Sequence, residues 1–136
     1  MTLFLDTNVL LDGYFQRVGA AASDALIARC DGATLSCTIA WHTLSNAFYL
    51  VRGHSKSSAI AFQFITDLLA WAEVAQTAKA DALWALKSGV NDFEDALQLS
   101  AAISCAADVV ITRNTSDFKS SAVPVMTPEE FLAAHP

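Results

Sequence analysis

The sequence contains few of the residues that cross-link, break or punctuate a polypeptide chain. Its 136 residues include only three cysteines, three prolines and five glycines. Cys30, Cys37 and Cys105 show neither a C-x-x-C pattern nor the Cys/His spacing of zinc sites. We therefore expect free buried thiols and no zinc site or disulfide framework. Because the sparse Pro and Gly mark no linker, we expect one domain over residues 1–136.

Charged residues are also scarce, yet no stretch of the chain is suited to cross a membrane. Apolar residues make up 54% of the sequence and charged residues only 16%, which excludes intrinsic disorder and allows a large core. Polar and acidic side chains interrupt the most apolar stretches, residues 58–75 and 96–107, so no uncharged span of about 20 residues exists. The N-terminus lacks the features of a secretory signal, and we expect a cytoplasmic protein.

The charge balance gives no general sign of nucleic-acid binding. Fourteen acidic and eight basic residues leave a net charge of −6, so the chain has no overall basic footprint. An enzyme that holds phosphate through metal ions, however, needs local carboxylates, whose charge the metal partly neutralises. The distribution of the acidic residues is therefore more informative than their sum.

Short apolar runs alternate with longer helical patterns along the chain, and we find no internal repeat. The expected strands cover residues 3–5, 33–36, 71–75, 108–112 and 123–126. The expected helices cover residues 20–29, 38–51 and 78–87. Two more run from Ser57 or Ser58 to residue 69 and from Asn91 or Asp92 to residue 106. A last helix follows Thr127 as its cap, with Pro128 at the first helical position. This alternation predicts an α/β fold with a parallel sheet covered by helices on both faces. Ligands of such sheets bind beyond the carboxyl ends of the strands.

Polar side chains follow two of these strands at positions where a buried sheet does not need them. Asp6, Thr7 and Asn8 follow the first strand, and residues 112–117 (TRNTSD) follow the fourth. A third acidic group, residues 92–95 (DFED), opens the helix that leads into the fourth strand. The three groups converge if the first and fourth strands are neighbours, which the sequence alone leaves open.

Clustered carboxylates repel one another and raise one another's pKa unless cations lie between them. Oxygen ligands without nearby His or Cys favour Mg²⁺ or Mn²⁺ over zinc, and such ions activate water for in-line attack on phosphorus. The pattern therefore predicts phosphodiester hydrolysis. Each acid also has a structural interpretation, because Asp92 and Asp95 could serve as helix-capping residues and Asp117 as a turn residue.

Residues 1–12 (MTLFLDTNVLLD) resemble the opening of PIN domains, metal-dependent ribonucleases that include the VapC-like toxins of bacterial toxin–antitoxin pairs. Residues 92–98 (DFEDALQ) and 111–118 (ITRNTSDF) resemble the third and fourth motifs of this family, and residues 123–131 (VPVMTPEEF) resemble its tail. The resemblance implies a PIN-like three-layer α/β/α fold with about four to five parallel strands. It also implies an endoribonuclease that requires Mg²⁺ or Mn²⁺, cuts RNA and is held in check by a small antitoxin.

The resemblance also implies roles for individual residues. Asp6 and Asp95 would be the main metal ligands and Asp117 a further acid. The residues that would orient ligands, water or phosphate are Asn8, Thr112 and Asn114. Asp92 stays ambiguous between cap and ligand.

Two basic residues flank the expected site. Arg113 and Lys119 are our candidates for contacts to backbone phosphates, because such contacts position RNA without reading its sequence. The surplus of apolar residues is compatible with a homodimer or with an antitoxin-binding surface.

One position departs from the family pattern. The helix at 38–51 should carry the second acid, and Asn46 stands there. An amide can coordinate through its oxygen, but the loss of one negative charge should weaken binding of a second metal most. Two alternatives therefore stay open: a catalytically weakened PIN-like scaffold that binds RNA or protein, and a haloacid-dehalogenase-like phosphatase. The phosphatase motif needs an Asp where this chain has Asn8.

Overall fold

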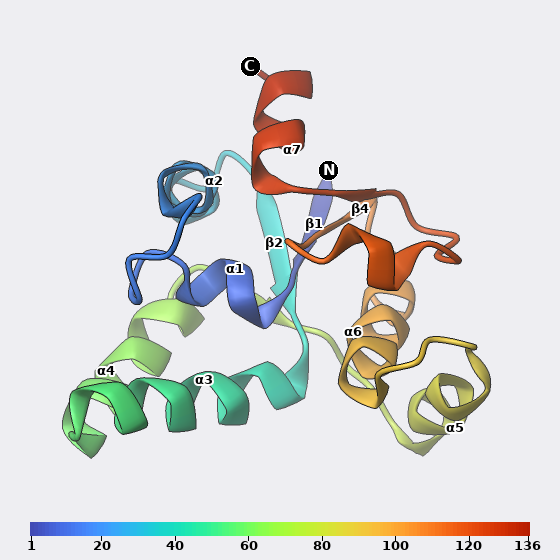
Figure 1. Cartoon of the computed structure of the whole chain (residues 1–136), viewed down its shortest axis with the longest axis horizontal. Helices are drawn as coiled ribbons and strands as arrows, with labels where there is room; N and C mark the ends of the chain where they lie inside the picture. The colour runs from blue at the N-terminus through green and yellow to red at the C-terminus, as the bar shows by residue number, and fades with distance from the viewer.

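The computed structural model describes residues 1–136, and its five strands form one parallel sheet in the order β3-β2-β1-β4-β5 (Figure 1). The strands are β1 (Thr2–Leu5), β2 (Ser36–Ile39), β3 (Glu73–Val74), β4 (Val109–Ile111) and β5 (Val125–Met126). β1 lies at the centre and pairs with β2 and β4. Leu3, Phe4 and Leu5 are all fully buried, as expected for a strand covered on both faces.

Helices cover both faces of this sheet. They are α1 (Thr7–Leu11), α2 (Ala20–Asp31), α3 (Trp41–Ser55), α4 (Ser58–Leu69), α5 (Lys79–Lys87), α6 (Phe93–Ser104) and α7 (Pro128–Ala134), with a 3₁₀ turn η1 (Thr115–Phe118). Leu3 and Leu5 pack with residues of α1, α2, α4 and α7 on one face, whereas Phe4 packs with Ala101 and Ala102 of α6 on the other. The predicted three-layer α/β/α architecture is confirmed.

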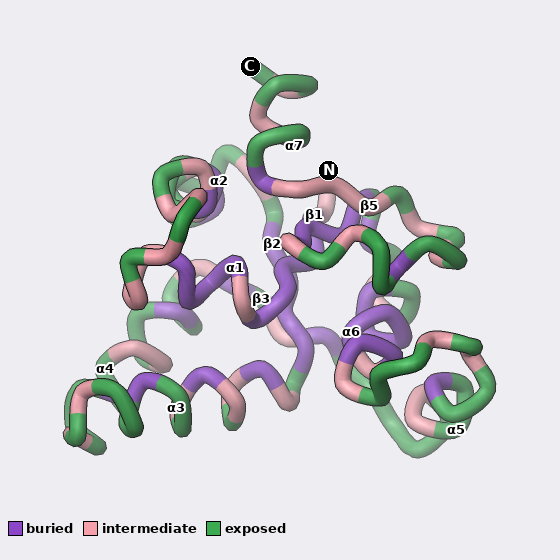
Figure 2. Tube along the Cα trace, viewed as in Figure 1, coloured by how far each residue is buried: buried purple, intermediate pink, exposed green.

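The helices α3 and α4 form a hairpin that extends past the sheet, and α5 lies against α6 (Figure 1). Leu11, Ala47, Val51 and Ala61 form a separate buried cluster that joins this hairpin to α1. Figure 2 shows that buried residues concentrate along the central strands, while much of the outer surface of the hairpin is exposed. No helix is long and apolar enough to span a bilayer.

Capping residues begin α6 and α7 where the sequence predicts. Thr127 caps α7 through its hydroxyl, which accepts a hydrogen bond from the Glu130 N–H, while the Glu130 carboxylate accepts one from the Thr127 N–H. Asp92 caps α6, because its Oδ1 accepts a hydrogen bond from the Asp95 N–H at 3.1 Å. Capping thus fixes the start of the helix that carries the expected third acidic motif.

The second strand lies three residues later than predicted. The backbone N–H groups of Thr34 and Leu35 both donate to the Arg29 carbonyl, so the turn after α2 uses residues that we assigned to a strand. Ala33 also has a positive φ of 56°, which is typical of a turn and not of a strand. β2 therefore spans Ser36–Ile39, and α3 begins at Trp41 instead of near residue 38.

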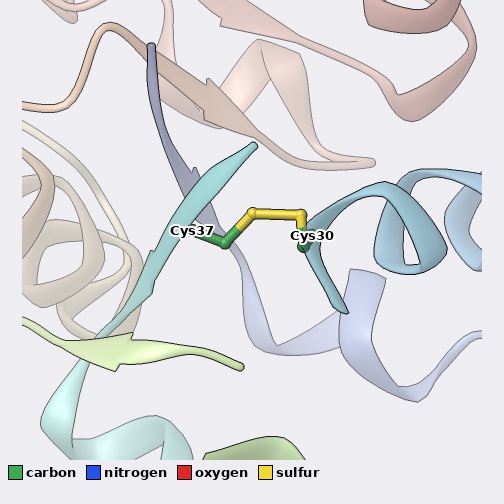
Figure 3. Close-up of a disulfide and its surroundings, with 2 residues drawn as sticks. All are labelled: Cys30 and Cys37. Carbon is green, nitrogen blue, oxygen red and sulfur yellow. A yellow bond between two sulfur atoms is a disulfide. The ribbon is translucent and has the colours of Figure 1, made fainter. Parts of the chain in front are cut away.

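The prediction of three free cysteines is wrong. Cys30, near the end of α2, and Cys37, in β2, form a disulfide with Cα atoms 6.0 Å apart, and Cys105 is the one free thiol (Figure 3). The tight turn between α2 and β2 returns the chain on itself, so two cysteines seven residues apart face each other. Both cysteines are buried among the apolar residues of the sheet face.

Candidate functional site

The carboxyl ends of β1 and β4 meet at one edge of the sheet. Leu5 pairs with Ile111, so Asp6 and Thr112, the next residues along each strand, are neighbours. The Asp6 N–H donates to the Ile111 carbonyl at 3.0 Å, and Thr112 Oγ1 donates to Asp6 Oδ2 at 2.8 Å. The adjacency that the sequence left open is therefore present.

Asp6 is almost completely buried, with 2% of its surface exposed. The pKa of Asp6 is raised from 3.8 to about 6, mainly by burial and less by the negative charge of Glu94, while the hydrogen bond from Thr112 acts in the opposite direction. A carboxylate in this position gains stability when a cation binds beside it.

Asp95 lies in the first turn of α6 and interacts electrostatically with Asp6. Burial, followed by the charges of Glu94, Asp92 and Asp6, raises the pKa of Asp95 to about 7. Two aspartates about ninety residues apart in the sequence, one after β1 and one on α6, therefore act on each other. This is the convergence that the three acidic groups of the sequence suggested.

Carboxylate oxygens of Asp92, Glu94 and Asp95 all lie within 4.8 Å of one another. The donors are oxygens only, with no sulfur and no imidazole in the group, which suits a hard divalent cation such as Mg²⁺ or Mn²⁺. Burial, and to a lesser extent the charges of neighbouring carboxylates, raise the pKa values of Asp6 and Asp95, so a bound cation would stabilise their ionised forms. The residues present therefore fit a divalent metal ion.

A pocket of about 500 Å³ opens beside these acids. Among the predicted site residues it is lined by Asp92, Asp95, Asn114 and Asp117. Lys119 adds a positive charge to the lining. Asp6 is too deeply buried to be among the lining residues.

A buried glutamine that the sequence did not single out connects these parts. Gln98 on α6 is fully buried, and its Nε2 donates to Thr7 Oγ1 at 3.0 Å and to Glu94 Oε1 at 2.9 Å. The same Nε2 lies 3.4 Å from Asp6 Oδ1. Thr7 in turn is hydrogen-bonded to Thr43 of α3 at 2.9 Å. A glutamine on the apolar face of a helix, one turn after Glu94, is the signal that could have identified this residue.

Glu94 receives a second contact from α3. His42 Nε2 lies 3.2 Å from Glu94 Oε1, the oxygen that also accepts from Gln98. Burial acts to raise the pKa of Glu94, but the hydrogen bonds from His42 and Gln98 outweigh it and lower the pKa. Glu94 is thus kept ionised beside two aspartates whose pKa values are raised.

Three of the predicted residues lie outside this group of contacts. Asn8 accepts a hydrogen bond from Arg17 at 3.0 Å. Asn46, on α3, is half-buried and makes no side-chain hydrogen bond; Thr43, one turn earlier, is the residue of α3 that reaches Thr7. Arg113 does not line the pocket.

Arg113 instead connects the end of β4 to α2 and α7. Its Nε donates to Asp12 Oδ2 at 3.0 Å, Nη1 donates to both carboxylate oxygens of Glu129 at 2.6 and 2.7 Å, and Nη2 donates to Ser23 at 2.9 Å. Asp12, in turn, is buried. Of the two residues predicted to contact phosphate, only Lys119 lines the pocket.

Solved structures with a similar fold come from bacterial toxin–antitoxin complexes. A chain of VapBC-1 from nontypeable Haemophilus influenzae has a TM-score of 0.72 at 15% identity, covering 95% of this chain and 99% of that one. A chain of VapBC2 from Rickettsia felis bound to a DNA fragment from their promoter has a TM-score of 0.70 at 17% identity, covering 93% and 98%. A toxin–antitoxin complex from Klebsiella pneumoniae gives 0.67 at 20% identity, covering 94% and 98%.

No curated protein shows a significant sequence match. The family model described as a PIN domain matches residues 2–116, which include Asp6, α6 and residues 112–116 after β4, and ends one residue before Asp117. The agreement of this match with the sheet order and with the solved structures means that the chain belongs to the PIN-domain family.

Proposed function

We propose that this protein is an endoribonuclease that requires Mg²⁺ or Mn²⁺ and acts as the toxin of a type II toxin–antitoxin pair. The observation that carries the proposal is the convergence of Asp6 and Asp95, whose pKa values are raised by burial and by neighbouring carboxylates. A nuclease fold supports this assignment, since the chain is a PIN domain. Membership of that family also sets the phosphatase alternative aside.

In this proposal Asp6, Asp95 and Asp117 hold the cation. When bound, the ion supplies a water of lowered pKa and neutralises charge on the phosphate. Thr112, which is fully buried, fixes the orientation of Asp6 by donating to its Oδ2. The Asn114 N–H donates to Thr112 Oγ1 at 3.1 Å, so the hydroxyl hydrogen of Thr112 is free to face the carboxylate.

The pocket supplies the groups that would receive the RNA. Asn114 and Asp117 line it together with Lys119, whose ammonium group suits a phosphate oxygen. The overall charge of −6 disfavours RNA at long range, so the local cation and Lys119 must provide the attraction. An RNA substrate implies a cytoplasmic location, which we include in the proposal.

An antitoxin partner and a homodimer are also part of the proposal. The similar structures include toxin–antitoxin complexes. Large apolar side chains are exposed on the α3–α4 hairpin, among them Tyr49 at 63% and Phe62 at 64%. Exposed aromatic side chains of this kind are typical of surfaces that another protein covers.

The test is cleavage of a structured RNA by purified Asp6→Asn and Asp95→Asn variants with Mn²⁺ and with excess chelator. Each variant should lose cleavage while keeping its fold. A matched control is Asp24→Asn, because Asp24 is exposed on α2 and makes no hydrogen bond through its side chain. Wild-type rates in both site variants would refute the assignment.

A second candidate function follows from Asn46, which stands at the position of the family's second acid. A scaffold that binds RNA without cutting it would retain RNA both with Mn²⁺ and with chelator, and would produce no fragments in either. Gel-shift and fragment analysis of the same incubations therefore separates the two functions.

A further inference from the structure

We infer that Glu94 binds the divalent cation and supplies the negative charge that Asn46 does not. This inference rests on the metal site of the proposed function and names a ligand within it. Asn46 and Glu94 belong to different helices, α3 and α6, but both helices begin at the same edge of the sheet, where Thr43 and His42 of α3 approach Gln98 and Glu94 of α6.

Glu94 lies between the two aspartates of the site. Gln98 Nε2 is 2.9 Å from Glu94 Oε1 and 3.4 Å from Asp6 Oδ1, so a single nitrogen atom separates these two carboxylates. On its other side, Glu94 has a carboxylate oxygen within 4.8 Å of one from Asp95. Opposite ligands of Mg²⁺ lie about 4.2 Å apart, because each bond is about 2.1 Å long. A small rotation of the side chains therefore brings Glu94 and Asp95 to ligand distance.

The contacts of Glu94 hold the side chain and leave one oxygen for a cation. His42 and Gln98 both contact Oε1, and neither of these hydrogen bonds uses Oε2. The glutamate side chain is 38% exposed, so Glu94 remains accessible from solvent. Metal ligands are commonly oriented in this way, by hydrogen bonds from residues that do not themselves bind the metal.

Gln98 holds Glu94 and Asp6 from the buried side of the site, through the nitrogen of its side-chain amide. Its side chain is fully buried, and its Oε1 has no hydrogen-bond partner. An unpaired buried carbonyl costs about 1–3 kcal/mol. The amide is nevertheless oriented so that its nitrogen faces Asp6 and Glu94, which fixes both carboxylates at one point. A cation bound by both carboxylates would offset the cost of leaving the Gln98 carbonyl unpaired.

The rival explanation is that Glu94 serves only to hold His42 and the start of α3. Glu94→Gln separates the two roles, because the amide oxygen still accepts from His42 and Gln98 while the charge is lost. The experiment is calorimetric titration of Mn²⁺ into wild type, Glu94→Gln, Asn46→Asp and the double variant. Glu73→Gln is the control, since Glu73 is exposed on β3 and its side chain makes no hydrogen bond or ion pair.

We expect Glu94→Gln to weaken Mn²⁺ binding by about tenfold or more, and Asn46→Asp to recover at least part of this loss in the double variant. Circular dichroism and thermal melting should show that all variants are folded. Unchanged Mn²⁺ affinity in Glu94→Gln would overturn the inference, and a double variant as weak as Glu94→Gln would overturn the exchange with position 46. Absence of Mn²⁺ binding in wild type would instead count against the proposed function.

Discussion

Replacing Asp6 with Asn should stabilise the metal-free protein at neutral pH while abolishing its proposed activity. Burial raises the pKa of Asp6 from 3.8 to about 6. Well below pH 3.8 the carboxyl is protonated in both the folded and the unfolded chain, so it has no effect on their difference in free energy. As the pH rises to about 6, the unfolded chain loses this proton first, and the folded state becomes progressively less stable.

The size of the effect follows from the change in pKa. A rise of about two pKa units corresponds to about 3 kcal/mol, since each unit is worth about 1.36 kcal/mol. Solvent screening reduces this value little, because Asp6 is only 2% exposed. The amide oxygen of Asn retains an acceptor for Thr112. The Asp6→Asn variant should therefore gain up to about 3 kcal/mol at pH 7 and almost nothing at pH 3.5.

The assay is urea unfolding followed by circular dichroism, with chelator present, at a series of pH values from 3.5 to 7.5. Asp24→Asn is the control, because it makes the same chemical change at an exposed position on α2, outside the site. Addition of Mn²⁺ should stabilise wild type but have little effect on Asp6→Asn. A variant that is no more stable than wild type at pH 7, or whose advantage is equal at all pH values, would refute the reasoning.

Three further predictions concern the scaffold around the site. Arg113→Met should destabilise the fold by about 2 kcal/mol in urea unfolding, because buried Asp12 keeps only its longer ion pair with Arg17, at 3.7 Å, and a loss below about 1 kcal/mol would contradict this role. Reduction of the Cys30–Cys37 disulfide removes a restriction on the unfolded chain and should lower the free energy of unfolding by about 2 kcal/mol. Identical melting curves with and without reductant would argue against this stabilising role. Thr127→Ala removes the cap of α7 and should cost about 1 kcal/mol in the same measurement, whereas an unchanged midpoint would show that the cap is dispensable.

The architecture could be predicted because local signals agree with it. Apolar runs, caps and alternating periods identify most of the strands and helices, and the Thr127 cap with Pro128 after it is found as expected. The boundaries of β2 could not be predicted, because the hydrogen bonds of Thr34 and Leu35 to Arg29 depend on how α2 ends. The short helix α1 also escaped detection, since Val9, Leu10 and Leu11 are all buried and give no amphipathic period.

Contacts that depend on how the chain turns and packs could not be obtained from spacing alone. Cys30 and Cys37 meet because a tight turn reverses the chain between them. Arg113 was expected to face phosphate because it follows Thr112 in the site motif, but its three nitrogens contact acceptors on α2, α7 and the segment between α1 and α2. A basic residue beside a site is informative only once the acids within its reach are known.

The number of negative charges at the site also could not be obtained from the sequence motifs alone. Counting acids by motif gives a site that lacks one carboxylate at Asn46. Counting them by position in space gives a different result, because α6 brings Glu94 and Asp95 together in its first turn and Gln98 connects Glu94 to Asp6. A negative charge acts on a cation through distance and local dielectric, and not through the helix that carries it. On the inference that Glu94 binds the cation, cleavage by this chain should depend on Glu94 although position 46 is an amide.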